Sequence, residues 1–342
     1  MRIELDESFR PPRWLRNRHI QSILPSLSVR RRWLGPRLEP LLAASRPLLI
    51  DCGEGVRLAA HHTAPPRPLR ASPRVALLLH GWEGSAESVY VLSLARELHA
   101  RGFDVVRLNL RDHGDTQHLN RGLFHSCRLA EVIGAARRVQ SLFPGAPLHL
   151  AGFSLGGNFM LRVAAARESG LRIARAVAIS PVLDPRATLL AMERGLHAYQ
   201  RYFVRKWTRS LRRKQVLWPE EYDFGEIMAS ASVRQMTAEL VRRFTPFTSL
   251  EEYLDGYALV GARLAPLEVP CTVITALDDP LIPARDIERL APSPALRIVA
   301  TRWGGHCGFL DRPSGVTWAE RRAAQELDAP LTAPQREALL AK

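Results

Sequence analysis

The chain contains 342 residues, of which 46% are hydrophobic and 24% charged, with 22 glycines and 25 prolines. This composition is typical of globular proteins and excludes disordered, collagen-like and repeat-rich chains. At about 150 residues per domain, the length fits two domains or one large domain with an insertion. The formal net charge is +14, and only three of the 48 basic residues are lysines. No basic tail, zinc pattern or RNP-like aromatic strand accompanies this charge, so we expect no nucleic-acid binding.

Cysteine usage and the N-terminal segment both bear on where the protein acts. Cys52, Cys127, Cys271 and Cys307 are far apart in the chain and form no C-x-x-C pair, which is typical of a reducing compartment. The chain is charged from its second residue, begins with no apolar signal-peptide region and contains no run of about 18 apolar residues. We therefore expect a soluble, cytoplasmic protein.

Residues 1–47 are rich in arginine and proline and include Trp14 and Trp33. They are too apolar for a disordered tail and too irregular for a strand or helix of normal length. We expect them to form an extended arm that packs on the rest of the protein.

From about residue 48 onward, short β-rich runs alternate with helix-length amphipathic segments. This alternation is typical of parallel βαβ units. Several runs are continuously apolar, as expected of strands that are covered on both faces. We predict helices at residues 88–100, 129–142 and 158–168, each ending at glycine or proline. The eight predicted strands are residues 48–52, 56–61, 75–80, 104–110, 148–153, 176–180, 271–277 and 296–301.

The alternation is interrupted at residues 185–266, where helical periodicity replaces strand patterns. We expect this segment to be a helical cap inserted into an α/β core formed by residues 48–184 and 267–342. A helical subdomain that only completes the fold is an equal alternative, because an apolar stripe indicates burial without indicating against what. The stripe has spacings of 3, 4, 3, 4 and 4 residues, which match one helix face, and comprises Leu189, Met192, Leu196, Tyr199, Phe203 and Trp207.

The same segment carries a positively charged face. Eight basic residues and no acidic residue occur from Arg194 to Lys214, opposite the apolar stripe. A basic amphipathic helix can lie on an anionic membrane surface, so peripheral membrane contact through this cap helix is one interpretation. The favoured interpretation is a solvated outer face of an arginine-rich protein.

The sharpest motif is Gly-Phe-Ser-Leu-Gly-Gly at residues 152–157, where a predicted strand meets a helical segment. A G-x-S-x-G sequence at such a junction is typical of a nucleophile elbow, with Ser154 as the nucleophile. The strained turn brings strand and helix so close that a side chain at Gly152 or Gly156 would collide. The alternative is a tight turn whose serine has no catalytic role. The position of the motif at a strand–helix junction argues against this alternative.

A nucleophilic serine needs a base, and the base needs a carboxylate that orients it. After an elbow of this kind, the acid follows the penultimate strand and the histidine follows the last. Here Asp278 and Asp279 follow the strand at 271–277, and His306, the only histidine after them, follows the strand at 296–301. We expect His306 to be the base, the alternative being a plain loop histidine between glycines.

Two adjacent aspartates compete for the role of orienting carboxylate. Asp279 is preferred, because the D-x-x-I-P run beginning there places its carboxylate at the turn apex. Asp278 remains the alternative. The aspartate that does not orient the histidine would then form an Asx turn.

Acyl transfer also needs two backbone N–H donors for the developing oxyanion. The sequence His-Gly-Trp at residues 80–82 follows the strand at 75–80. We therefore expect the N–H groups of Trp82 and of Leu155, the residue after the nucleophile, to be these donors.

A polar loop contains Asp112, His113, Asp115 and His118. Their spacing matches no standard zinc or EF-hand pattern, and a polar loop over the carboxyl edge of the sheet accounts for it. We expect no metal and no cofactor, since hydrolysis by an activated serine requires neither.

At this point the sequence resembles the α/β-hydrolase superfamily, and within it the YheT-like branch, or AB hydrolase 4 family, of serine esterases and lipid hydrolases. The resemblance implies an α/β-hydrolase fold, with a mostly parallel central sheet of about eight strands flanked by helices and an inserted helical cap. It also implies carboxylic-ester hydrolysis by a triad of Ser154, Asp279 and His306. The segments that carry it are residues 9–19 (Phe-Arg-Pro-Pro-Arg-Trp-Leu-Arg-Asn-Arg-His), 80–81, 152–157, 278–280 and 305–306.

Two features qualify the resemblance. Relatives carry an R-G-x-x-G loop after the strand at 104–110, whereas this chain has Arg-Asp-His-Gly-Asp at 111–115, which alters the expected substrate mouth. Relatives are also discussed as acyltransferases through an H-x-x-x-x-D motif, present here from His306 to Asp311. The same pattern occurs at residues 99–104, at an ordinary helix–strand junction, so it carries little weight.

Together these features predict a cytoplasmic serine esterase that acts on short- to medium-chain acyl esters or lipids through an acyl-enzyme intermediate. An acyltransferase or thioesterase on the same triad is one alternative, because alcohol, thiol or water can resolve an acyl-enzyme. A catalytically silent binding module on the same fold is another, because a fold does not establish an activity.

Overall fold

The computed structural model describes residues 1–65, 73–312 and 315–340. Within these residues, one sheet contains nine strands: β1 (Arg2–Leu5), β2 (Ser45–Asp51), β3 (Arg57–Thr63), β4 (Val75–Leu79), β5 (Asp104–Leu108), β6 (Leu148–Phe153), β7 (Ile173–Ile179), β8 (Cys271–Ala276) and β9 (Leu296–Thr301). Their order across the sheet is β1-β9-β8-β7-β6-β4-β5-β3-β2. All strands from β1 to β5 in this order run parallel, and β3 runs antiparallel to both β5 and β2.

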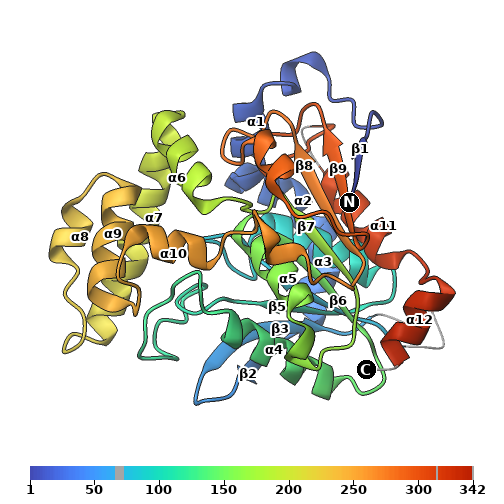
Figure 1. The fold of residues 1–342 in the computed structure, drawn as a ribbon, viewed down its shortest axis with the longest axis horizontal. Coiled ribbons are helices and arrows are strands. Elements are labelled where there is room, and N and C mark those ends of the chain that lie inside the picture. The colour runs from blue at the N-terminus through green and yellow to red at the C-terminus, as the bar shows by residue number, and fades with distance from the viewer. Residues whose placement is uncertain (66–72, 313–314, 341–342) are drawn as a thin grey trace.

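Helices cover both faces of the sheet (Figure 1). The described helices are α1 (Arg18–Ile23), α2 (Ser28–Ala44), α3 (Val89–His99), α4 (Leu129–Leu142), α5 (Leu155–Ala165), α6 (Pro185–Arg194), α7 (His197–Leu217), α8 (Gly225–Ala229), α9 (Val233–Phe244), α10 (Leu250–Gly256), α11 (Trp318–Asp328) and α12 (Ala333–Leu340). Helices α2, α3 and α11 share one buried apolar cluster, and α4 and α5 belong to another. The predicted α/β fold with a mostly parallel sheet is therefore confirmed.

All eight strands predicted from the sequence are present, within a few residues of their predicted limits. Every residue of β4 and β6 is buried, which explains why these strands read as continuous apolar runs. The ninth strand, β1, was not predicted. It is a four-residue edge strand whose residues are mostly exposed, so no apolar pattern marks it.

The arm differs from its prediction. Residues 1–47 contain β1 and the 17-residue helix α2, so the expectation that they hold no strand or helix of normal length is wrong. Pro36 and Pro40 lie inside α2, where each removes a backbone donor, and this hid the helix in the sequence. Burial of Leu34, Leu38 and Leu41 against the sheet-covering helices stabilises α2 despite the prolines.

Helices α6 to α10 follow β7 and precede β8, and they lie together at one side of the molecule (Figure 1). The apolar stripe predicted as one helix face spans two helices instead, because the chain leaves the helix at Gly195 and Leu196. Leu196 is 43% exposed, whereas Leu189 and Tyr199 on either side are buried. None of the described helices is long and apolar enough to cross a membrane.

The basic face of α7 is only partly solvated. Arg201, Arg205 and Arg209 are exposed, as predicted for an outer face. Lys214, in contrast, is fully buried. Its charge is compensated there by the carboxylate of Asp112, which lies 2.9 Å from the ammonium group.

Candidate active site

The turn between β6 and α5 places Ser154 in a strained conformation. Its φ is +51° and its ψ is −117°, outside the usual regions for a residue with a side chain. A Cβ atom on Gly152 would lie 2.3 Å from the backbone of Gly156, and a Cβ atom on Gly156 would lie 2.3 Å from the carbonyl oxygen of His80. Glycine is therefore the residue that both positions can accommodate, and Ser154 projects from a very tight strand–helix contact.

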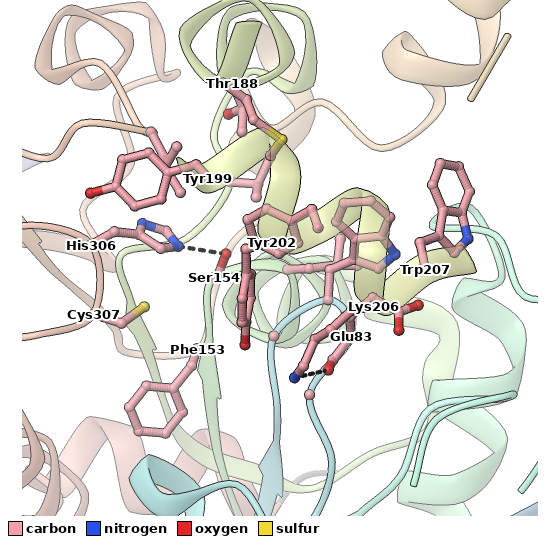
Figure 2. A pocket seen from close by; sticks show the side chains of 18 of the residues that line it. Glu83, Phe153, Ser154, Thr188, Tyr199, Tyr202, Lys206, Trp207, His306 and Cys307 are labelled. Carbon is pink, nitrogen blue, oxygen red and sulfur yellow. Dashed lines mark hydrogen bonds between the residues drawn. The ribbon is translucent and has the colours of Figure 1, made fainter. Parts of the chain in front are cut away.

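Three side chains that are far apart in the sequence meet at the carboxyl end of the sheet. His306, in the loop after β9, places Nε2 2.9 Å from the Oγ atom of Ser154 (Figure 2). Its Nδ1 atom lies 2.9 Å from the Oδ2 atom of Asp279, in the loop after β8. With Nδ1–H donating to the carboxylate, Nε2 is free to accept the hydroxyl proton of Ser154. The arrangement is that of a nucleophile, a base and an orienting acid.

The two aspartates have different contacts. Asp279 uses Oδ2 for His306, while its Oδ1 accepts hydrogen bonds from the N–H groups of Leu281 (2.8 Å) and Ile282 (3.0 Å). Asp278 accepts from the N–H of Gly305 at 2.9 Å. The expectation that the aspartate not bound to the histidine forms the Asx turn is therefore wrong, since Asp279 performs both roles. Burial raises the pKa of Asp278 to about 6.

Opposing influences act on the imidazole of His306. Burial is the largest single influence and disfavours its charged form, but the neighbouring Cys307 sulfur and the Asp279 carboxylate, by charge and hydrogen bonding, together outweigh it. The pKa of His306 is therefore raised well above its ordinary value of 6.5. A base with a raised pKa accepts a proton readily, provided that the pH keeps it neutral beforehand.

Backbone amides beside Ser154 are available to a ligand. Within the described residues, the N–H groups of Trp82 and Leu155 donate to no protein acceptor. Gly81 lies so close to the nucleophile that a Cβ atom there would be 3.3 Å from the Cβ of Ser154. The side chain of the buried His80 bonds the carbonyl oxygen of Gly81 at 2.7 Å, which fixes the turn. Two donors without a protein acceptor in the described residues thus lie in the segments that adjoin Ser154.

Helix α7 holds the loop that carries Trp82. The ring of Phe203 stacks on Trp82 at 5.1 Å, and Trp207 meets it edge-on at 5.0 Å. Between them in the sequence, Lys206 donates to the backbone oxygen of Glu83 at 2.9 Å, a contact that Figure 2 also shows. Burial raises the pKa of the Glu83 carboxyl to about 7. The sequence analysis missed Glu83 and Lys206, because nothing in either segment indicates that the two would meet.

Ser154 and His306 lie in the wall of a cavity of about 750 Å³ between the sheet end and the cap helices. The cavity is lined mainly by apolar and aromatic side chains, and Cys307 also faces it. All members of the predicted apolar stripe except Leu196 are among its lining residues: Leu189, Met192, Tyr199, Phe203 and Trp207. The stripe therefore faces a space beside the candidate nucleophile.

The polar loop after β5 is tied to the cap by ion pairs. Asp112 pairs with Lys214, and Asp115 pairs with Arg213. Burial raises the pKa of Asp112, although the Lys214 ammonium opposes this. No group of three or more His, Cys, Asp or Glu residues suited to a metal ion occurs in the described parts of the chain.

The last residue of the H-x-x-x-x-D pattern lies away from the catalytic candidates. The carboxylate of Asp311 pairs with Arg321 in α11, whereas His306 faces Ser154. The pattern therefore brings no second functional group to the cavity.

Comparisons with known proteins agree with the fold and the kind of chemistry. Phospholipase ABHD3 of Mus musculus is 25% identical over 259 residues, which cover 74% of this chain and 63% of the relative, so the chain spans less than two thirds of that protein. YheT of Escherichia coli (strain K12) is 27% identical over 311 residues, covering 88% of this chain and 87% of the relative. An esterase of Pyrococcus furiosus shares the fold with a TM-score of 0.54 at 14% identity, covering 84% of this chain and 94% of that one.

A family model also matches the greater part of the chain. The model of the alpha/beta hydrolase fold matches residues 75–313, which include the elbow, both aspartates and His306. The chain is related at low identity to proteins of the esterase and lipase kind. Because this match extends over more than half of its residues, the chain belongs to the alpha/beta hydrolase fold family.

Proposed function

We propose that this protein is a serine carboxylic-ester hydrolase that acts through an acyl-enzyme intermediate. The observation that carries the proposal is the position of His306, whose two ring nitrogens lie 2.9 Å from Ser154 and 2.9 Å from Asp279. A buried carboxylate, an oriented imidazole and a serine on a strained elbow form the arrangement that activates a hydroxyl for attack on a carbonyl.

In the proposed mechanism, the Oγ atom of Ser154 attacks the ester carbonyl carbon while Nε2 of His306 takes the hydroxyl proton. The N–H groups of Trp82 and Leu155 stabilise the oxyanion. Nε2 then returns the proton to the departing alcohol, which leaves an acyl group on Ser154. Water attacks this acyl group and gives a proton to Nε2, which returns it to the Oγ atom of Ser154 as the acid is released. Asp279 accepts the Nδ1–H throughout and stabilises the imidazolium.

The cavity supports a substrate with an apolar acyl group of short to medium length, as an ester or a lipid. Its volume of about 750 Å³ lies within the range of small-molecule sites, and its wall is mainly apolar. A relative at 25% identity is named a phospholipase, which agrees with a lipid-like substrate. We therefore propose that the acyl chain lies along α6 and α7, with the carbonyl at Ser154.

A fluorophosphonate probe tests the nucleophile without knowledge of the substrate. We expect the purified wild type to be labelled and Ser154→Ala to be unlabelled at equal concentration and with the same circular dichroism spectrum. A panel of p-nitrophenyl esters from acetate to palmitate then tests the substrate class, and we expect kcat/KM to peak at short to medium chains. Absence of labelling in a folded wild type, or hydrolysis that survives Ser154→Ala, would contradict the proposal.

A further inference from the structure

The arm motif at residues 9–19 has no role in the mechanism above, yet its last two residues, Arg18 and His19, begin α1. Helix α1 lies against the loop that connects β9 to α11 and carries His306 (Figure 1). Two consecutive side chains of α1, Gln21 and Ser22, bind the backbone of this loop.

Gln21 joins the arm to the chain just beyond His306. The side chain of Gln21 is fully buried. Its amide nitrogen donates to the carbonyl oxygens of Leu310 (2.9 Å) and Leu15 (2.7 Å), and its amide oxygen accepts from the N–H of Leu310 at 2.7 Å. One buried amide therefore makes three hydrogen bonds to backbone groups on both sides of the contact, which is costly to disrupt because each group is removed from water.

Ser22 holds the backbone of His306 itself. The N–H of His306 donates to the Oγ atom of Ser22 at 2.8 Å, and the same hydroxyl donates to the carbonyl oxygen of Arg18 at 2.7 Å. The imidazole is thus fixed from two directions: by Asp279 at its ring and by Ser22 at its main chain.

The loop needs such support because its backbone is strained. Gly304, Gly305, Cys307 and Phe309 all have positive φ, of +147°, +55°, +60° and +48°. Residues with side chains rarely adopt this conformation, and they keep it only where the surroundings determine it. Two of these four positions are not glycine, so the loop does not hold this shape by its own preference.

The loop also packs closely against the backbone of α1. A Cβ atom on Gly305 would lie 2.4 Å from the carbonyl oxygen of Arg18, and one on Gly308 would lie 2.0 Å from that of Gln21. The other side of α1 contacts the cap, where Nδ1 of His19 lies 3.0 Å from the hydroxyl of Tyr199 in α7. Helix α1 therefore lies between the His306 loop and the wall of the cavity.

We infer that Gln21 and Ser22 are positioning residues, which hold the strained His306 loop so that Nε2 stays directed at Ser154. The inference rests on the proposed function for its kinetic consequence. It assigns helix α1, in which the arm motif ends, to the assembly of the catalytic site, where a displacement of about 1 Å can lower a rate by about a hundredfold.

The experiment compares Ser22→Ala, Gln21→Met and Ser22→Thr with Ile20→Ala, a matched control on the exposed side of the same helix, where the side chain is 40% exposed. With p-nitrophenyl acetate, we expect kcat to fall at least about tenfold in the first two variants while KM changes less than about twofold. Ser22→Thr, which keeps the hydroxyl, should restore kcat. The rate of fluorophosphonate labelling should follow kcat. Circular dichroism and melting temperature identify any variant that fails to fold. If Gln21→Met does not fold, the inference is tested by Ser22→Ala, which removes only a hydroxyl.

A second readout separates this inference from the proposed function. The Nδ1 proton of His306, bonded to Asp279, is expected as a far-downfield line in the proton NMR spectrum that is absent from His306→Gln. We expect Ser22→Ala to shift or broaden this line whether or not the protein hydrolyses esters. An unlabelled wild type would overturn the proposed function alone. Folded Ser22→Ala and Gln21→Met variants that match Ile20→Ala in kcat and in this NMR line would overturn the positioning role.

Discussion

The ammonium group of Lys214 lies 2.9 Å from the carboxylate of Asp112, and both side chains are nearly inaccessible to solvent. Lys214 also donates to the carbonyl oxygen of Asn120 at 2.5 Å, so α7 of the cap is tied to the loop after β5. The structure thus connects cap and core through a buried charge pair.

We expect Lys214→Met to destabilise the protein by about 3–5 kcal/mol, because it leaves the Asp112 carboxylate buried without its cationic partner. Urea unfolding measures the change. The double variant Lys214→Met/Asp112→Asn removes both charges and should recover much of the loss. A single variant as stable as wild type would show that the pair does not hold the cap.

The pH dependence of ester hydrolysis should reflect the raised pKa of His306. Catalysis needs the neutral imidazole, so the rate falls as the pH drops through this pKa. Because Cys307 and Asp279 raise the pKa above its ordinary value despite burial, the acid limb of kcat/KM should have its midpoint above pH 6.5. A kcat/KM profile measured from pH 5 to 10 checks this, and a midpoint below 6.5 would contradict it.

Asp279→Asn should lower kcat by about 10⁴-fold, because an amide no longer selects the tautomer that leaves Nε2 free. It should also move the acid limb to lower pH, since one cause of the raised pKa is removed. Asp278→Asn is the matched control. The carboxylate of Asp278 accepts a hydrogen bond from the N–H of Gly305, whereas the imidazole of His306 bonds Asp279. We therefore expect a much smaller loss of kcat.

Gly156→Ala should prevent folding or lower stability by more than about 3 kcal/mol. Its Cβ atom would lie 2.3 Å and 2.5 Å from the carbonyl oxygens of His80 and Leu79, which cannot move without separating α5 from the sheet. Gly35→Ala in α2 is the control, because its Cβ atom meets nothing within 4 Å and alanine favours the helix by about 1 kcal/mol. Thermal unfolding of both variants measures the contrast.

Trp207→Ala should lower kcat for a short ester by at least about tenfold, because Trp82 loses its edge contact and its backbone N–H is then poorly placed for the oxyanion. Val216→Ala, at a position of α7 that is 74% exposed, is the control. Equal values of kcat in the two variants would indicate that the cap does not position this donor.

The strands and the meeting of Ser154, His306 and an aspartate could be predicted because their signals are local. The buried strands β4 and β6 are continuously apolar, and the elbow is a short motif with a steric cause. Chain order then selects His306 and the aspartate pair. Asp279 was preferred over Asp278 because the D-x-x-I-P run places it in a turn. In the structure its Oδ1 atom accepts the N–H groups of Leu281 and Ile282 in that turn.

The remaining features depend on contacts between distant segments. Lys214 in α7 is buried because it pairs with Asp112, 102 residues earlier in the loop after β5. The sequence of α7 alone therefore predicts a solvated residue at this position. Helix α2 was hidden by Pro36 and Pro40, whose local cost is offset by tertiary burial. Gln21 and Ser22 carry no sequence signal of their own, because their function depends on a loop near residue 306.

The parallel pairing of β1 with β9 has a consequence for the order of folding. Arg2 pairs with Arg297, and α1 packs beside the loop that follows β9, so these N-terminal segments cannot make their contacts until residues near 300 have been synthesised. Contacts of such long sequence separation slow folding. A growing chain can form the Ser154 elbow before the His306 loop has been synthesised. Under the proposed function, hydrolysis therefore begins only after this loop has been made and has joined α1.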